Sequence, residues 1–205
     1  MRLALPLLLL ACTGCSVARP TTEIVQTPSS DWRFAATPDD RARLRDWRDA
    51  FVSALAETRA SGHADDIAHE GALLVPDAAI GGHIPNGLYR CRVIKLGGKS
   101  PGMLDYVAYP AFTCRVQQKG RVQSFAKLGG SQRQVGLIFR NDQLREVFLG
   151  TLMLGDETRA MQYGEDRMRD VAGYVERIGP QRWRLIMPSP HFESRMDVME
   201  LAPAP

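Results

Sequence analysis

The sequence predicts an α+β fold that is mainly β, a small antiparallel up-and-down barrel of seven to nine strands with one or two N-terminal helices packed on it. Three features lead to this prediction. Short β-like runs separated by Gly, Asn, Asp or Pro fill the chain after Gly87, as in sandwiches and barrels. The runs follow one another through short turns, and such sequential hairpins favour the barrel. Helical periodicity is found before Gly87.

The first fifteen residues form a secretory signal that ends at a cysteine. Arg2 gives a cationic start, and the apolar run Leu3–Ala11 is shorter than the roughly 20 residues that span a bilayer. Thr13-Gly14-Cys15 resembles the end of a bacterial lipobox, which implies that residues 1–14 are removed and that Cys15 is acylated. Cys12 is the alternative site of acylation. The alternative to a lipid anchor is ordinary secretion, with cleavage near the same place.

The residue after Cys15 bears on the compartment. In Gram-negative lipoproteins an Asp at this place favours the inner membrane, so Ser16 indicates, by resemblance, the periplasmic face of the outer membrane. We therefore expect the membrane to be a partner through the lipid anchor. A soluble periplasmic or secreted protein is the alternative.

The remainder of the chain is predicted to contain a tether and one domain. Residues 15–32 are rich in Pro, Thr and Ser and predict a flexible tether. Residues 33–205 suit a single globular domain, helical over 37–74 and a β-barrel over 87–201. The formal net charge is +3 without a concentrated basic stripe, so we expect no nucleic-acid partner.

The helical part begins with a strong start signal. Thr37-Pro38-Asp39-Asp40 combines a Thr cap, Pro at the first helical position and acids in the first turn. Apolar residues at helical spacing then predict a face that docks on a sheet, namely Leu44, Trp47, Phe51 and Leu55. Ser61-Gly62 ends this helix, a shorter one is expected from Ala64 to about Leu74, and 76–86 is predicted as loop.

The β part is predicted from alternation and turn residues. Strands are expected near 87–96, 105–117, 121–128, 133–140, 144–154, 171–178, 182–187 and 195–201. Pro110 is expected at a bulge or sheet edge of the second strand. The segment 161–169 is either a strand stub or a loop.

Cys91 and Cys114 are the two cysteines that remain without the signal, and an exported protein allows them to form a disulfide. A hairpin centred between Gly102 and Met103 would place them directly opposite each other. The same register pairs Tyr89 with Val116 and Val93 with Phe112 on the cysteine face. Such a crosslink should stabilise the domain by about 3 kcal/mol.

Three arginines of this hairpin form a candidate ligand or anion face. The predicted register places Arg90 opposite Arg115, with Arg92 near by, on the face away from the cysteines. Like charges that face each other are unfavourable unless something neutralises them. A solvated outer face with carboxylates near by is the simpler interpretation, and we prefer it.

Candidate chemistry is sparse. Asp156 and Glu157 follow a long apolar strand and could serve acid/base work, although such a pair is more often a solvated turn. His191 and Glu193 lie in a Pro-rich loop, but neighbours in sequence seldom form a catalytic set. We expect no catalytic residue, no metal and no cofactor, because zinc-ligand spacing, phosphate-binding Gly loops and nucleophile elbows are absent from the sequence.

Several segments together resemble a known family. They include Ile84–Gly97, Leu104–Val116, Gly130–Arg133, Val147–Thr151, Gly155–Glu157, Tyr163-Gly164, Glu176–Gly179, Arg182–Leu185, Phe192–Ser194 and Asp197-Val198. This pattern is similar to the bacterial family of exported proteins called domain of unknown function 4893. The resemblance covers nearly all of the chain after the signal and implies no catalytic residues. A looser similarity, in architecture and a Tyr-x-Cys motif, connects the chain with periplasmic inhibitors of lysozymes or proteases.

The sequence thus predicts a lipid-anchored periplasmic protein that is a non-enzymatic binding or envelope-associated module. Its partner would be an envelope protein or a small ligand, held by the loops or in the lumen of the barrel. The alternative is an envelope-acting hydrolase that uses Asp156, Glu157, His191 or Glu193 in loops at a barrel end.

Overall fold

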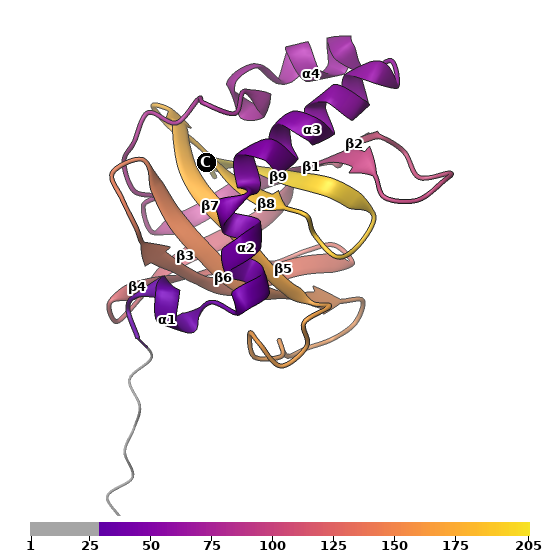
Figure 1. Ribbon diagram of the computed structural model, residues 1–205. Coiled ribbons are helices and arrows are strands. Elements are labelled where there is room, and N and C mark those ends of the chain that lie inside the picture. The colour runs from indigo at the N-terminus through magenta and orange to yellow at the C-terminus, as the bar shows by residue number, and fades with distance from the viewer. Residues whose placement is uncertain (1–28) are drawn as a thin grey trace, which may run out of the picture.

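The computed structural model describes residues 29–205 (Figure 1). The signal segment, Cys12, Cys15 and most of the predicted tether lie outside the described residues. Among the described residues, no helix is long and apolar enough to cross a membrane.

The β part closes into a barrel. Its strands are β1 (Gly87–Gly98), β2 (Tyr106–Ala108), β3 (Phe112–Lys119), β4 (Val122–Lys127), β5 (Gln132–Arg140), β6 (Arg145–Leu154), β7 (Asp170–Gly179), β8 (Arg182–Pro188) and β9 (Ser194–Pro203). From β3 to β9 each strand pairs antiparallel with the next, and β1 pairs with both β3 and β9. The result is an eight-stranded antiparallel barrel with β2 as an extra strand, as the fold class predicted. Residues 161–169 form a loop.

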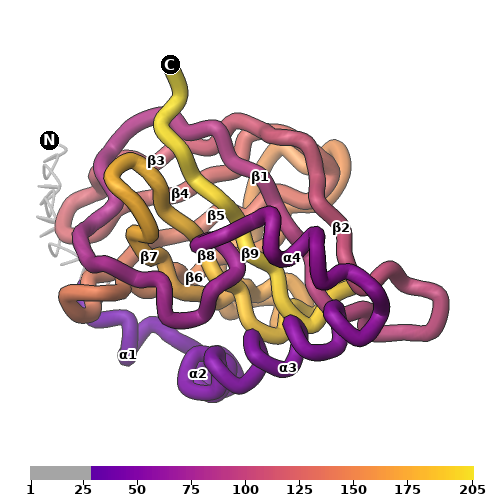
Figure 2. Tube along the Cα trace, turned by 90° about the horizontal axis from the view of Figure 1, so that it is seen from above, coloured from indigo at the N-terminus to yellow at the C-terminus, as the bar shows by residue number. Residues whose placement is uncertain are grey.

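The helical part consists of α1 (Trp32–Ala35), α2 (Pro38–Arg45), α3 (Trp47–Ala60), α4 (Ala64–Glu70) and the 3-10 helix η1 (Gly71–Leu74). The predicted cap is present, because Thr37 Oγ1 accepts a hydrogen bond from the Asp40 N–H at 3.2 Å. The single helix predicted from Pro38 to Ser61 is instead divided at Asp46. Figure 2 shows that α2 and α3 follow one another along the same side of the barrel, so the division lets two short helices track its curved wall.

The two longer helices cover different parts of the barrel exterior. Phe51, Leu55 and their neighbours on α3 pack on outward-facing residues of β1, β8 and β9, among them Ile94 and Val198. Leu44 of α2 packs on the outer faces of β6 and β7. The apolar stripe predicted from helical spacing is therefore the docking face of these helices.

Cys91 and Cys114 form a disulfide inside the barrel, with Cα atoms 5.8 Å apart, but their predicted register is wrong by two residues. Cys91 lies opposite Phe112, and Cys114 lies opposite Tyr89. The hairpin loop is set by Asp105, whose side chain accepts a hydrogen bond from the Gly98 N–H at 2.9 Å, and not by a turn centred at Gly102. Because this error is an even number, the β3 side chains keep their predicted faces. β2 differs from the predicted register by three residues, so its side chains lie on the opposite faces from those predicted.

Pro110 acts as predicted, at a break in the second strand. β2 pairs with the second half of β1 and β3 with its first half, and residues 109–111 between them join neither strand. Proline cannot donate to a ladder, which explains why the pairing stops there. The break separates two registers along the same edge of β1.

One end of the barrel is closed by the chain itself. Ile84, in the loop before β1, is 1% exposed and packs into the barrel core. Its N–H donates to Glu146 Oε2 at 3.0 Å, and its carbonyl accepts from Gln123 Nε2 at 3.0 Å. The Tyr89 hydroxyl donates to the Pro85 carbonyl at 2.7 Å. The 76–86 loop is therefore a plug whose polar groups are bound to the barrel.

Candidate functional site

The opposite end of the barrel is open and polar inside. Inward-facing positions change from apolar residues around the disulfide to Lys95, Lys127, Gln132, Gln134 and Asp197 near this end. A cavity of about 110 Å³ lies here, below the loop between β4 and β5, and it is called the main cavity because Lys95 and Lys127 both line it. It is the concave, partly apolar and partly polar kind of site that binds small molecules.

Lys95 of β1 is neutralised by carboxylates. Its Nζ lies 2.9 Å from Asp197 Oδ2 and 3.3 Å from Glu193 Oε2. Burial lowers the pKa of Lys95, but the attraction of Asp197 and Glu193 outweighs it, so the pKa lies above its ordinary value. Lys95 is thus a protonated centre that holds two acids at the cavity.

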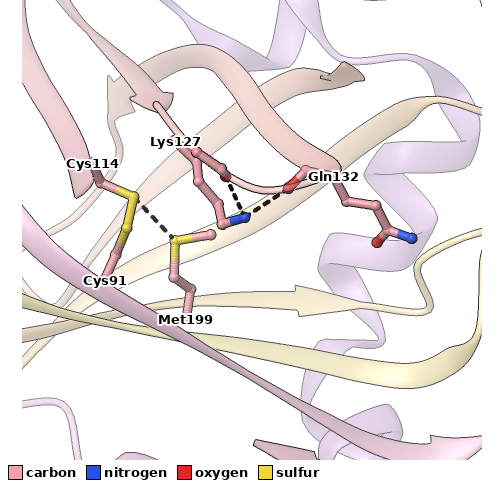
Figure 3. The surroundings of a disulfide bond; sticks show 6 residues. Cys91, Cys114, Lys127, Gln132 and Met199 are labelled. Carbon is pink, nitrogen blue, oxygen red and sulfur yellow. Dashed lines mark hydrogen bonds between the residues drawn. A yellow bond between two sulfur atoms is a disulfide. The ribbon is translucent and has the colours of Figure 1, made fainter. Parts of the chain in front are cut away.

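Lys127 of β4 has a different environment (Figure 3). Its Nζ donates to the carbonyls of Gly129 at 2.8 Å and Gln132 at 2.9 Å, and it lies 3.8 Å from the centre of the Phe112 ring. Among the described residues no carboxylate forms a salt bridge with it, although the residue is only 5% exposed. Burial, and then the positive charges of Arg133 and Lys95, lower the pKa of Lys127 to about 8.

Gln134 of β5 adds a second polar group without a partner. It is 4% exposed, and its Oε1 accepts no hydrogen bond from the described residues. It lines the main cavity and also a smaller one of about 20 Å³ below the loop between β8 and β9. A buried amide oxygen without a donor is costly unless water or a ligand satisfies it.

The rim of the open end is built from loops that connect the strands, and part of it is apolar. A further cavity of about 260 Å³ extends from Lys95 toward Met103, Leu104 and Tyr109. Leu104 is 71% exposed, and Phe192 in the opposite loop is 36% exposed. The approach to the buried lysines is therefore lined by apolar side chains.

The comparison with protein families finds a match over residues 32–201 to the model described as a domain of unknown function, DUF4893. The chain belongs to the DUF4893 family. The suspected resemblance is thereby confirmed. No curated protein and no solved structure matched this DUF4893 chain.

The three arginines of the predicted anion face do not gather at one site in this DUF4893 domain. Arg92 bonds to Glu70 and lies 3.2 Å from Glu200 Oε2, so its charge is balanced within the protein. Arg90 lines the same outer cavity as Arg92, whereas Arg115 lines a separate groove on the outer wall of β3 to β6. For Arg92, the structure therefore agrees with the simpler interpretation, in which carboxylates near by balance the arginine charge.

Asp156 and Glu157 lie in the loop between β6 and β7. Asp156 is exposed in a turn. Glu157 accepts a hydrogen bond from the Leu154 N–H at 2.9 Å and pairs with Arg169 at 2.5 Å. The Leu154 N–H and then Arg169 lower the pKa of Glu157, so this carboxylate is committed to holding the loop.

His191 and Glu193 lie in the loop between β8 and β9. His191 lines the smaller cavity, and burial followed by the charges of Arg43 and Lys99 lowers its pKa. Glu193 lines the main cavity, where it also accepts from Gln132 Nε2 at 3.0 Å. The backbone φ of Glu193 is 64°, which is rare for a residue other than glycine. The side-chain contacts of Glu193 at the open end hold this conformation.

Sequence reasoning missed the buried lysines and Gln134. The signal was present in the alternation, because Lys95 shares its face with Cys91 and Val93, and Lys127 shares its face with Phe125. A lysine at an inward position of a barrel strand is unusual and points to the lumen. Of the residues that the sequence singled out as chemical candidates, Glu193 lies in the main cavity.

Proposed function

We propose that this DUF4893 protein is a lipid-anchored periplasmic binding module, not an enzyme, that holds a small ligand in the open end of its barrel. The observation that carries the proposal is the pair Lys127 and Gln134. Both side chains line one cavity and both are at least nine-tenths buried. Among the described residues, Gln134 Oε1 accepts no hydrogen bond and the Lys127 ammonium has no carboxylate partner.

The energetics support a ligand at this place. A buried charge without a counter-ion and a buried amide oxygen without a donor each destabilise the folded chain. At the closed end, Gln123 and Glu146 are bound by the plug loop. The chain therefore supplies hydrogen-bond partners for its buried polar groups at the closed end, whereas at the open end it leaves a cavity that a ligand can fill.

The proposed compartment rests on the sequence. The signal with its lipobox-like Cys15 supports the anchor, and Ser16 supports the periplasmic face of the outer membrane. The Cys91–Cys114 disulfide fits an oxidising compartment. The predicted tether over residues 15–32 would leave the open end accessible to periplasmic solutes.

The hydrolase alternative receives less support. Its acids and histidine do not line one cavity: Asp156 and Glu157 line none of the three at the open end, His191 lines the smaller one and Glu193 the main one. Glu157 is also bound to Arg169. Turnover of cell-wall or lipid substrates that disappears in an Asp156→Ala, Glu157→Ala, His191→Ala or Glu193→Ala variant would restore this alternative.

The binding proposal is tested by ligand retention. The mature chain, with Cys15→Ser to keep it soluble, is incubated with the low-molecular-weight fraction of envelope extract and examined by native mass spectrometry. We expect a bound small molecule that is lost in Ser131→Trp, which blocks the cavity from an exposed lining position. Ser100→Trp, on an exposed loop outside the cavity, is the matched control. Failure to retain any small molecule contradicts the proposal.

The anchor is tested separately. Mass spectrometry of the membrane-extracted protein should show an acylated N-terminal Cys15, and Cys15→Ser should release the protein into the periplasm. Cys12→Ser should leave acylation unchanged. An unacylated wild-type N-terminus would remove the anchor from the proposal, whatever the outcome of the ligand experiment.

A further inference from the structure

This inference rests on the proposed function and names the class of ligand. We propose that the cavity at the open end takes a small hydroxylated monocarboxylate, whose carboxylate pairs with the Lys127 ammonium and whose hydroxyl donates to Gln134 Oε1. Both groups line the same cavity of about 110 Å³. This volume corresponds to three or four water molecules at about 30 Å³ each and suits a ligand of a few heavy atoms.

The charges in the cavity select an anion. Lys95 lies between Asp197 and Glu193, so its charge is compensated. Lys127 donates two of its three N–H groups to the carbonyls of Gly129 and Gln132, and its Nζ also lies over the Phe112 ring, but none of these partners brings a negative charge. A neutral ligand would leave this buried ammonium without a counter-ion, whereas a carboxylate would form a charge-assisted hydrogen bond with it.

The same charges select against a dianion. Glu193 lines the main cavity, and Asp197 pairs with Lys95 and lines the smaller cavity. A phosphate dianion would meet the Glu193 carboxylate, and Lys95, the cation beside it, is already shared with Asp197. Phosphate sites also favour several donors or a forked arginine, and this cavity offers one uncompensated ammonium.

Gln134 supplies the second contact. Its Oε1 is buried without a donor from the described residues, so a ligand that presents an O–H or N–H group there gains a hydrogen bond. A hydroxyl meets this need without adding charge. The carbon skeleton of the ligand would contact Val93 and Phe112, which line the same cavity.

Three matched probes test the class: lactate, propionate, which lacks its hydroxyl, and propane-1,2-diol, which lacks its carboxylate. Titration of the mature chain at pH 7 by NMR should rank lactate first. We expect propionate to bind about 5- to 10-fold more weakly, as for one lost hydrogen bond, and the diol at least about 10-fold more weakly. Inorganic phosphate should bind more weakly than lactate.

Two variants assign the contacts. Lys127→Met keeps the length of the side chain and should reduce lactate affinity at least about 10-fold, whereas Lys119→Met, at an exposed position on the far turn, should not change it. Gln134→Leu should lower lactate affinity to that of propionate and leave propionate unaffected. The second variant keeps the test decisive even where Lys127→Met does not fold.

The pH dependence separates Lys127 from its neighbours. Lactate affinity should fall as pH rises above about 8, where Lys127 loses its proton. Lys95 on β1 stays charged there because Asp197 and Glu193 raise its pKa, and the other cation that acts on Lys127 is Arg133 on β5. In Lys127→Met the affinity should be flat over this range. A flat profile in the wild type contradicts the assignment to Lys127.

The outcomes distinguish the two proposals. Equal binding of the diol and lactate, or tighter binding of phosphate, overturns the ligand class. If the envelope extract at the same time yields a retained molecule, the proposed function stands. Absence of binding by all probes and by the extract overturns both.

Discussion

The two ends of the barrel use the same kinds of buried residue in opposite ways. At the closed end, Gln123 donates to the Ile84 carbonyl and to Asn86 Oδ1, and Glu146 accepts from the Ile84 N–H. At the open end, Gln134 Oε1 has no donor among the described residues, and Lys127 has no carboxylate. The plug loop supplies the missing partners at the first end, and nothing in the described chain supplies them at the second.

Along the barrel axis, the buried polar groups of the closed end therefore stabilise the fold, whereas those of the open end are available for function. Buried polar groups that are fully bonded fix a single structure, whereas groups left without partners reduce stability unless something binds them. The closed end has one exception, because the Trp183 Nε1–H has no acceptor among the described residues. The comparison predicts that substitutions at the closed end destabilise the fold, and that substitutions at the open end mainly change binding.

The largest effect should come from Ile84→Ala at the plug. Ile84 is 1% exposed and packs with the barrel core, so truncation leaves a cavity and should cost about 2–5 kcal/mol in the free energy of unfolding. Ile80→Ala, in the same loop but 58% exposed, should change stability by less than about 0.5 kcal/mol. Urea denaturation measures both. Similar effects for the two variants would mean that the loop is not a plug.

The disulfide should follow in size. It closes a segment with a sequence separation of 23 residues between β1 and β3, and the double variant Cys91→Ala/Cys114→Ala should lose about 3 kcal/mol on the chain-entropy model. Because the bond lies in the core between the two ends, the loss should lower stability without altering ligand affinity at temperatures where the variant is folded. A loss of ligand affinity in the folded variant would contradict the prediction that the disulfide affects stability and not binding.

The fold was predictable because its signals are local. The Thr37 cap, the Pro110 break and the alternation of each strand fixed the elements to within a few residues. Two features were not predictable. The division at Asp46 follows the curvature of a barrel wall that no local pattern encodes, and the hairpin register depends on the side chain of Asp105 meeting the Gly98 N–H.

The site was less predictable than the fold. Alternation alone places Lys95 and Lys127 inside, but whether such a lysine is compensated depends on contacts between distant strands. Asp197, which neutralises Lys95, comes 102 residues later in the chain. The difference between the two barrel ends is likewise set by the plug loop, whose position follows from the packing of Ile84 and not from its own sequence pattern.

Lys127 should also give the stability a pH dependence. Its pKa is about 8 in the folded protein, whereas a lysine in the unfolded chain has a pKa near about 10.4. Between these values the unfolded state binds more protons, so stability should rise as pH increases from about 8 to about 10. Relative to Lys127→Met, the wild type should gain about 1–3 kcal/mol over this range. Equal slopes in urea denaturation at pH 7, 8.5 and 10 would contradict the buried, uncompensated ammonium.

The smallest and sharpest test compares two glutamines. Gln123 and Gln134 are 8% and 4% exposed, one near each end of the barrel. Gln123→Leu leaves the Ile84 carbonyl and Asn86 without a donor and should cost about 1–3 kcal/mol. Gln134→Leu removes an amide whose oxygen is already unsatisfied, so the ligand-free protein should be unchanged or more stable by up to about 1 kcal/mol.

Thermal unfolding of both variants, with and without lactate, completes this comparison. Ligand binding stabilises the folded state, so lactate should raise the melting temperature of Gln123→Leu as it does that of the wild type. In Gln134→Leu the increase should be smaller, because the hydroxyl contact is lost. If Gln134→Leu were as destabilising as Gln123→Leu, the Gln134 amide would be bonded within the protein, and the contrast between the two ends would fail.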